Sequence, residues 1–146
     1  MTSRILFVCL GNICRSPAAE GAFRAVRPDC QTDSAGTSGW HVGEPPYGPM
    51  QAAALARGLD LSDLRARQFR TADFQNFDLI IGMDAANLSK VEAMRPPGNT
   101  VPVKLFTEFA PAANADFVPD PYYTRDFDSV LNLIQAAAHG LAAHLG

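Results

Sequence analysis

The sequence lacks the features that mark several classes of protein. It contains no hydrophobic run long enough to span a membrane, and the apolar stretch at residues 5–10 is too short for the core of a signal peptide. The formal net charge is −3, so no broad basic surface for nucleic acid is expected. The cysteines are few and odd in number, which favours free thiols over a disulfide framework: Cys9, Cys14 and Cys30. We therefore expect a cytoplasmic protein that binds neither membranes nor nucleic acid.

Metal-ligand spacing is also missing. The histidines His41, His139 and His144 form no zinc-ligand pair, alone or with the cysteines, so no metal site and no cofactor are expected. The densest basic stretch, Arg65 to Arg70, is interpreted as a solvated face, because charge runs usually are.

Short apolar runs alternate with helical patterns along the whole chain, which is typical of parallel strands joined by crossover helices. Strands are expected at residues 5–9, 79–81 and 101–106, the last at an edge of the sheet because it contains Pro102. Helices are expected at residues 17–26 and 50–57, from a cap at Asp84 to about residue 94, and along the apolar stripe of residues 127–145. No linker or repeat divides the chain. The sequence therefore predicts a single α/β domain over residues 1–146.

The segment after the first strand has the composition of an anion-binding loop. It reads Cys9-Leu10-Gly11-Asn12-Ile13-Cys14-Arg15-Ser16 and leads into a helix whose start is indicated by Ser16 as cap and by Pro17. Gly11 and Asn12 tolerate the positive φ that such a turn requires. The backbone N–H groups would then point inward, and the helix N-terminus adds partial positive charge. The loop therefore predicts a phosphate-binding cradle.

Cys9 and Arg15 make this cradle suitable for phosphoryl transfer. A thiolate at the base of a phosphate site is a nucleophile for phosphoryl transfer. Arg15, six residues on, can bind two phosphate oxygens with its planar guanidinium, and Ser16 can donate a hydrogen bond to the sulfur. No metal is needed, because the N–H groups and Arg15 balance the phosphate charge. The plainer interpretation, a cysteine that ends a buried strand and a surface arginine, does not account for the Gly-Asn turn or the proline-started helix.

At these residues the chain resembles the low-molecular-weight protein tyrosine phosphatases. The resemblance begins with Ile5 to Glu20 and continues at Ser34-Ala35-Gly36-Thr37, Gly82-Met83-Asp84 and Asp120-Pro121-Tyr122-Tyr123. It implies a doubly wound, four-stranded parallel sheet with helices on both faces. It also implies that Cys9 is the nucleophile, that Arg15 binds phosphate, that Asp120 is the general acid, and that Asn12, hydrogen-bonded near Ser34, supports the loop.

The partners follow from the same resemblance. Tyrosine-phosphorylated proteins are the implied substrates, inorganic phosphate or another oxyanion is the implied ligand of the loop, and a monomer or weak dimer is the expected state.

The residues alone do not select Asp120 as the acid. Asp116 lies in the same irregular segment, and Asp126 and Asp128 follow closely, one of them expected to cap the last helix. Pro119 and Pro121 stiffen the backbone on both sides of Asp120, which suits a proton donor better than a helix cap. The choice of Asp120 rests chiefly on the resemblance.

Aromatic residues in two irregular segments are expected to wall the site. Trp40 lies in the Pro/Gly-rich residues 37–49, and Tyr122 and Tyr123 lie in residues 111–124. With Leu10 and Ile13 on the loop side, they would form a slot that accepts a phenyl phosphate and keeps the shorter serine and threonine esters from Cys9. Core packing remains the plainer reading for any one aromatic.

Cys14 and two departures from the family pattern leave questions open. Cys14 is either an apolar filler of the loop or a partner that captures oxidised Cys9 as a disulfide, and the resemblance favours the second as an added role. Cys30 is expected to be inert. Relatives usually carry Pro-x-Asp-Pro-Arg where this chain has Pro46-Tyr47-Gly48-Pro49-Met50, and the histidine common before Arg-Ala-Arg is Leu64. Both departures bear on peptide preference.

Three other functions share parts of this pattern. A thioredoxin-coupled arsenate reductase needs a redox cysteine pair near residues 82–90, which hold no cysteine. A protein arginine phosphatase typically has threonine where Ile13 stands. A non-catalytic phosphate-binding or phosphocarrier module could dispense with Asp120, so the retention of Cys9, Arg15 and Asp120 together favours the phosphatase.

Overall fold

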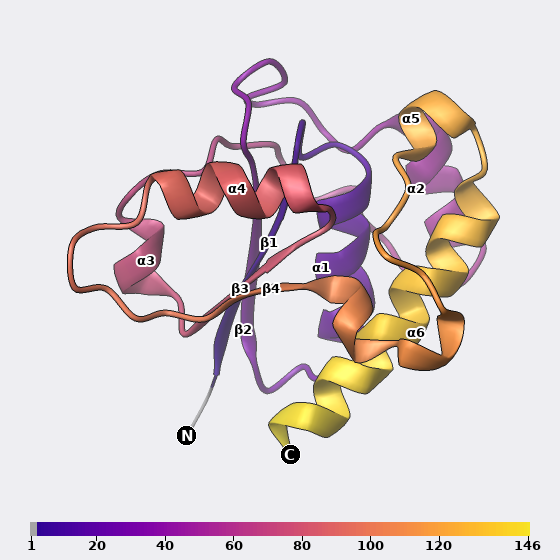
Figure 1. Cartoon of the computed structure of the whole chain (residues 1–146). Coiled ribbons are helices and arrows are strands. Elements are labelled where there is room, and N and C mark those ends of the chain that lie inside the picture. Colours follow the sequence, from indigo (N-terminus) through magenta and orange to yellow (C-terminus); the bar gives the residue numbers. More distant parts are fainter. Residues whose placement is uncertain (1–2) are drawn as a thin grey trace.

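The computed structural model describes residues 3–146 and contains a four-stranded parallel sheet in the order β2-β1-β3-β4 (Figure 1). The strands are β1 (Arg4–Cys9), β2 (Gln31–Gly36), β3 (Leu79–Gly82) and β4 (Val103–Leu105). Helices cover both faces, so the expected doubly wound α/β fold is confirmed. Within the described residues, no helix has the length and apolar character needed to cross a bilayer.

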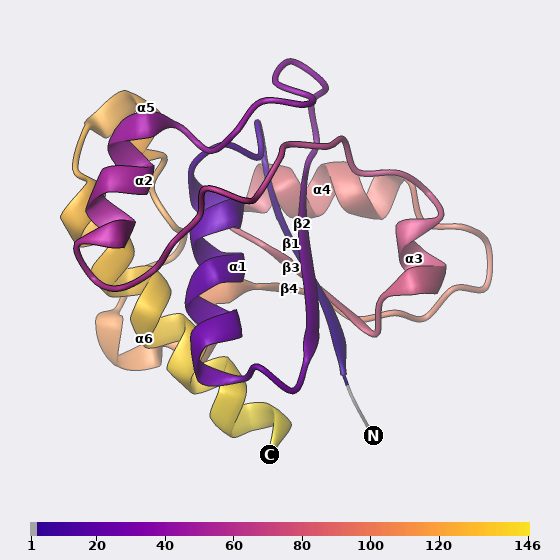
Figure 2. The same ribbon diagram turned by 180° about the vertical axis from the view of Figure 1, so that it is seen from behind.

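Successive residues of β1 build two separate cores, one on each face of the sheet. Ile5, Phe7 and Cys9 belong to the core shared with α1 (Arg15–Val26) and α6 (Phe127–Leu145). Leu6 and Val8 belong to the core on the other face, where α3 (Asp73–Asn76) and α4 (Ala85–Ala93) lie (Figure 2). A central strand buried on both faces must be apolar at every position, and residues 5–9 are.

The remaining helices lie on the α1 and α6 side. They are α2 (Gly48–Leu55), α5 (Pro121–Thr124) and the 3₁₀ turns η1 (Phe106–Phe109) and η2 (Pro111–Ala113). The long helix α6 passes so close to η1 that a Cβ at Gly140 would collide with the carbonyl group of Phe109. Glycine at this position is therefore a packing requirement.

Several expectations drawn from the residue pattern need correction. β2 was not predicted from its residues, because the sequence Gln-Thr-Asp-Ser-Ala-Gly has no apolar run and the strand lies at an edge of the sheet. Helix α1 begins at Arg15 with Cys14 as its cap position, so Ser16 is not the cap. Arg67 is not part of a solvated face: it pairs with Asp33 at 3.0 Å and with the buried Asp73 at 3.0 Å.

The other expected elements form, with ends that differ from expectation by at most two residues. β4 begins directly after Pro102 and forms the opposite edge of the sheet. Asp84 caps α4 in a capping box with Asn87, and Gly58, with φ +81°, follows α2. Asp126 caps α6 by accepting the Ser129 N–H at 3.1 Å.

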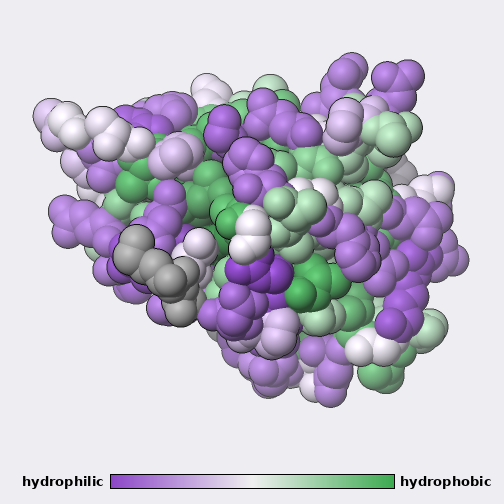
Figure 3. All heavy atoms as spheres, turned by 90° about the horizontal axis from the view of Figure 1, so that it is seen from below, coloured by the Kyte–Doolittle hydropathy of each residue, from purple (hydrophilic) through white to green (hydrophobic). Residues whose placement is uncertain are grey.

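The strand order places a crevice at the carboxyl ends of β1 and β3. From β1 the chain crosses to β2 on one side, whereas β3 and β4 lie on the other, and open α/β sheets bind ligands at such a switch point. The loop after β1, helix α5 and the segment that follows β2 all lie at this end, at the top of Figure 1. The opposite end of the molecule, seen in Figure 3, is a mixture of hydrophilic and hydrophobic side chains.

Candidate active site

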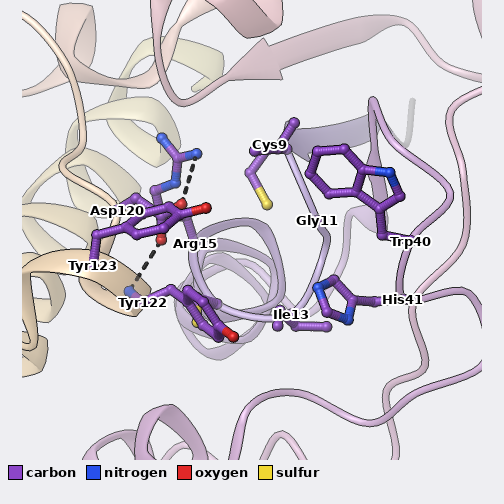
Figure 4. Close-up of a pocket in the computed structure, with 11 residues that line it drawn as sticks. Cys9, Gly11, Ile13, Arg15, Trp40, His41, Asp120, Tyr122 and Tyr123 are labelled. Carbon is purple, nitrogen blue, oxygen red and sulfur yellow. Dashed lines mark hydrogen bonds and ion pairs between the residues drawn. The ribbon is translucent and has the colours of Figure 1, made fainter.

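A pocket at this switch point brings together most of the residues singled out in the sequence (Figure 4). Its lining residues come from the loop after β1, the segment after β2 and the segment around α5: Cys9, Leu10, Gly11, Ile13, Cys14, Arg15, Trp40, His41, Asp120, Tyr122 and Tyr123. Asn12 and Ser16, also expected to contact substrate, are buried and do not line the pocket. His41 was not predicted as a site residue.

The sulfur of Cys9 lies at the floor of this pocket and is held by two neighbours. The Asn12 N–H donates to Cys9 Sγ at 3.2 Å, and Ser16 Oγ lies 3.0 Å from the same sulfur. Asn12 Nδ2 donates to Ser16 Oγ at 2.8 Å, which leaves the hydroxyl hydrogen of Ser16 free to point at the sulfur. Ser16 therefore contacts the sulfur from within the first turn of α1.

Asn12 links the loop to the body of the protein. Its φ is +59°, whereas Gly11 does not have a positive φ, so only one of the two expected residues adopts the left-handed conformation. Its side chain donates to Ser34 Oγ at 3.0 Å and accepts from the Arg67 N–H at 3.0 Å. Ser34 in turn donates to Glu20 at 2.7 Å.

Two details of this part of the site were not predictable from the sequence pattern: the raised pKa of Glu20 and the close approach of His41 to Gly11. Burial raises the pKa of Glu20, which the Ser34 hydrogen bond opposes. His41 leaves little space at Gly11: a Cβ there would lie 3.0 Å from His41 Cδ2, so the imidazole would have to shift slightly. His41 is next to Trp40 in the sequence, and its Nδ1 lies 2.9 Å from Glu44 Oε2. That adjacency is the one signal that could have identified His41.

Arg15 is buried beneath the pocket and surrounded by acceptors. Its Nη1 donates to Asp84 Oδ2 at 2.7 Å and to the Val118 carbonyl at 3.1 Å, and its Nη2 lies 3.5 Å from Asp120 Oδ2. Burial alone lowers the pKa of Arg15, but Cys9 and the two carboxylates outweigh it, so the pKa is raised and the cation is retained. In the part of the chain that the structure describes, Arg15 Nε is the only fully buried side-chain nitrogen or oxygen without a hydrogen-bond partner.

Asp84 was predicted only as a helix cap, but it has a second contact. One oxygen accepts the Asn87 N–H at 2.8 Å, and the other binds Arg15. The site therefore uses a capping residue to orient the guanidinium.

Asp120 also has two contacts. Its Oδ1 accepts the Tyr122 N–H at 3.1 Å as the cap of α5, and its Oδ2 faces Arg15 (Figure 4). The expectation that the flanking prolines suit a proton donor rather than a cap is therefore wrong, because the residue caps a helix and still presents one oxygen to the pocket. Asp116 is exposed and is not among the residues that line the pocket.

The aromatic residues stand on opposite sides of the pocket. Tyr122 and Tyr123 form an edge-to-face pair with ring centroids 5.3 Å apart, and Trp40 faces them across the sulfur (Figure 4). Trp40 and Tyr123 are about 70% exposed, at 72% and 71%, so they form a rim above the buried floor.

Comparison with known proteins decides the family. The model of the low molecular weight phosphotyrosine protein phosphatases matches residues 4–146. The chain belongs to this family. It is therefore a hydrolase, a protein-tyrosine phosphatase.

Individual relatives of this phosphatase agree with that assignment. The chain is 39% identical to the low molecular weight protein-tyrosine-phosphatase YfkJ of Bacillus subtilis, over 97% of this chain and 94% of the relative. The YfkJ crystal structure superposes with a TM-score of 0.93, covering 99% of this chain and 95% of that one.

Two further structures concern ligands and substrate classes related to phosphotyrosine. Wzb of Vibrio vulnificus, in complex with benzylphosphonate, is 26% identical with a TM-score of 0.88 and covers 99% of both chains. The Drosophila arginine phosphatase DARP is 29% identical with a TM-score of 0.90, covering 97% of this chain and 96% of that one.

Cys14 of the phosphatase lies in the pocket wall and is 3% exposed. Burial raises its pKa to about 12, with further contributions from Asp120 and Cys9. Its thiol is therefore protonated at neutral pH.

Proposed function

We propose that this phosphatase hydrolyses phosphotyrosine through a phosphocysteine on Cys9, with Arg15 binding the phosphate and Asp120 acting as general acid and then base. The proposal is supported mainly by one observation: the Cys9 sulfur and a buried Arg15 whose Nε has no partner among residues 3–146 meet at the floor of one pocket. A buried donor without a partner is costly, and a phosphate oxygen would satisfy it.

In the first step the Cys9 thiolate attacks phosphorus and an S–P bond forms. The bond from phosphorus to the tyrosine oxygen breaks, and the leaving phenolate takes the proton of the Asp120 carboxyl group. Arg15 and the N-terminus of α1 balance the charge on the phosphoryl oxygens. Asp84 keeps the guanidinium in position, because its Oδ2 holds Nη1 at 2.7 Å.

In the second step Asp120, now a carboxylate, removes a proton from water as the water attacks the phosphocysteine. The S–P bond breaks, inorganic phosphate forms and the Cys9 thiolate is restored. The Ser16 hydroxyl, 3.0 Å from the sulfur, stabilises the departing thiolate by a hydrogen bond.

The shape of the pocket supports tyrosine-phosphorylated proteins as the substrates. A phenyl ring between Trp40 and Tyr122 can carry its phosphate to the buried floor, and the shorter serine and threonine esters would leave theirs near the rim. Benzylphosphonate, bound in the Wzb structure, likewise joins an aromatic ring to a phosphonate. We further propose that residues 1–146 act as one cytoplasmic domain, as a monomer or weak dimer, with phosphate or another oxyanion as a ligand of the loop.

Trapping the covalent intermediate tests the mechanism. With para-nitrophenyl phosphate and rapid acid quench, mass spectrometry should find a phosphoryl group on the Cys9 peptide of the wild type. Cys9→Ser should lose turnover and still bind phosphate, whereas Cys30→Ser, a matched change at a cysteine outside the pocket, should keep normal turnover. A Cys9→Ser variant that retains even a few per cent of wild-type kcat would rule out the phosphocysteine.

Phosphoserine, phosphoarginine and arsenate serve as comparators for substrate class. Phosphoarginine is included because of the likeness to DARP. Ile13 presents an apolar side chain to the pocket, so we expect the aryl ester to be hydrolysed faster than phosphoarginine. Faster hydrolysis of phosphoarginine would contradict the tyrosine assignment without affecting the role of Cys9.

A further inference from the structure

Tyr47 and Arg125 form a contact beside the pocket that the chemistry above does not use. Arg125 Nη1 donates to the Tyr47 hydroxyl at 2.6 Å, and the guanidinium carbon lies 5.6 Å from the centre of the Tyr47 ring. The two residues are far apart in the sequence and join the segment after β2 to the segment that carries Asp120. Tyr47 is also one of the positions at which the chain departs from its family's usual pattern.

The pair lies directly behind the pocket wall. The Tyr47 ring is 5.1 Å from the ring of Tyr122, and the Tyr47 N–H donates to the Ile13 carbonyl at 2.8 Å. Both Tyr122 and Ile13 line the pocket, but Tyr47 does not. Tyr47 therefore fixes Arg125 relative to the pocket without reaching the substrate ring.

Arg125 adopts a backbone conformation that arginine does not favour. Its φ is +62°, at the position that ends α5, where glycine is the usual residue. A left-handed conformation is unfavourable for a residue with a side chain, because Cβ comes too close to the following carbonyl oxygen. Such strain is found where a side chain is needed in a particular place, so it directs attention to what this guanidinium binds.

The charge of Arg125 is not matched by a carboxylate. The half-buried Arg27 and Arg95 pair with an acid at 2.9 and 2.8 Å, whereas the exposed Arg65 donates only to backbone carbonyls, at 2.8 and 2.6 Å. Over residues 3–146, no carboxylate oxygen lies within 4.0 Å of the Arg125 guanidinium, and its one side-chain hydrogen bond is the one to Tyr47. Nη2 and Nε are thus left to bind another group.

We propose that Arg125, positioned by Tyr47, binds the carboxylate of an aspartate or glutamate that flanks the phosphotyrosine of the substrate. The proposal rests on the proposed function, because a phosphotyrosine seated on Cys9 places its neighbouring residues around the mouth of the pocket, beside the Tyr122 wall behind which the exposed Arg125 lies. A planar guanidinium with two free donors matches a carboxylate in a bidentate fork. Tyr47 accounts for the peptide preference that its departure from the family pattern leaves open.

Paired phosphopeptides test this subsite. One peptide carries glutamate on both sides of phosphotyrosine, and the other carries glutamine. For the wild type we expect kcat/KM to be about three- to tenfold higher for the glutamate peptide, mostly through KM, with a preference that shrinks as salt is added. Arg125→Gln should bring the ratio close to one, and Tyr47→Phe, which removes only the hydroxyl, should lower it in part.

Arg24→Gln is the matched control. It removes one positive charge from the far end of α1, nine residues or about 13 Å along the helix from Arg15, and should leave the ratio unchanged. Binding of both peptides to Cys9→Ser by calorimetry gives the same ratio without turnover, so a failure of the phosphocysteine mechanism is distinguishable from a failure of the subsite.

Two results would overturn the proposal. The first is a wild type that binds and hydrolyses both peptides equally. The second is an Arg125→Gln variant that is slower on both peptides and on para-nitrophenyl phosphate by the same factor, which would mean that the pair only holds the segment around Asp120 in place.

Discussion

The two segments that carry the proposed reacting groups are built in different ways. In the phosphate loop, residues 9–16, six of the eight residues are buried, and the side chains of Asn12 and Ser16 are used entirely inside the protein. In the acid segment, residues 114–126, only Val118 and Pro121 are buried. The acid segment is attached through Val118, whose N–H donates to the Met83 carbonyl at 2.8 Å and whose carbonyl accepts from Arg15.

This difference matches what each segment has to do. A group that stabilises charge in a transition state works best when its donors are already oriented, and a buried hydrogen-bond network provides that orientation. A general acid needs one oxygen near the leaving group, and the segment that carries it must let substrate enter and product leave. Arg15 lies in the phosphate loop and contacts the acid segment, so it connects the buried segment to the exposed one.

Arg15→Lys should have the largest effect on this coupling. A lysine cannot reproduce the contacts to Asp84, Val118 and a phosphate at the same time, because it lacks the planar fork. An arginine that stabilises a transferring phosphoryl group is worth about 10³-fold or more in kcat, and a loss of that order is expected on aryl phosphates. Arg24→Lys should leave kcat unchanged, and an Arg15→Lys enzyme within tenfold of the wild type would contradict the proposed role.

Asp120→Asn should have the next largest effect. General acid catalysis is worth about 10²- to 10⁴-fold, so kcat should fall by that order with little change in KM. The loss should shrink as the leaving phenol becomes more acidic, because a stable phenolate needs little protonation. Asp116→Asn, the same change four residues earlier, should be nearly silent. If the two variants exchange these effects, the wrong carboxylate has been chosen.

Asn12→Ala and Asn114→Ala compare the two segments directly. Both asparagines have a left-handed backbone, with φ +59° and +55°, but only Asn12 has buried side-chain hydrogen bonds. Chemical denaturation should show a loss of unfolding free energy of about 3 to 5 kcal/mol for Asn12→Ala and about 1 to 2 kcal/mol for Asn114→Ala. Equal losses would mean that the backbone conformation, and not the network, stabilises the phosphate loop.

Cys14→Ser should change the response to peroxide more than the rate of catalysis. We propose that peroxide converts the Cys9 thiolate to a sulfenic acid, which the Cys14 thiol attacks with release of water to form a disulfide. Oxidation also removes the negative charge of Cys9 that helps to raise the pKa of Cys14. Cys14→Ser should therefore be harder to reactivate with dithiothreitol. Wild-type protein that shows only overoxidised Cys9 by mass spectrometry would exclude this route.

Glu20→Gln should produce the smallest effect, on the pH dependence of stability. Burial raises the pKa of Glu20 above its ordinary value of 4.5, so the folded protein holds this proton more tightly than the unfolded chain. The tighter binding of this proton stabilises the folded protein in full below pH 4.5. The stabilisation is lost as the pH rises through the pKa that Glu20 has in the folded protein. Glutamine keeps an oxygen for Ser34 and cannot ionise, so denaturation curves across this window should flatten. An unchanged slope would show that another group titrates.

Much of the fold was predictable because it depends on local patterns. The unbroken apolar run of β1, the apolar stripe of α6 and the cap at Asp84 each require particular residues within one element. β2 was not predictable in this way: its residues are polar, and it becomes a strand because β1 offers it hydrogen-bond partners along the whole length.

The functional site likewise has one part that the local sequence determines and another that depends on contacts between distant segments. The sequence by itself determined the phosphate loop, because the proposed nucleophile, the turn and the arginine lie within eight consecutive residues and must come together wherever a strand leads into a helix. Only the tertiary structure decided which carboxylate approaches Arg15, that Asp84 holds the guanidinium, that His41 lines the pocket and that Tyr47 holds Arg125. These contacts join segments that are distant in the chain, and their geometry depends on where the sheet order and the packing of α4, α5 and α6 place each loop.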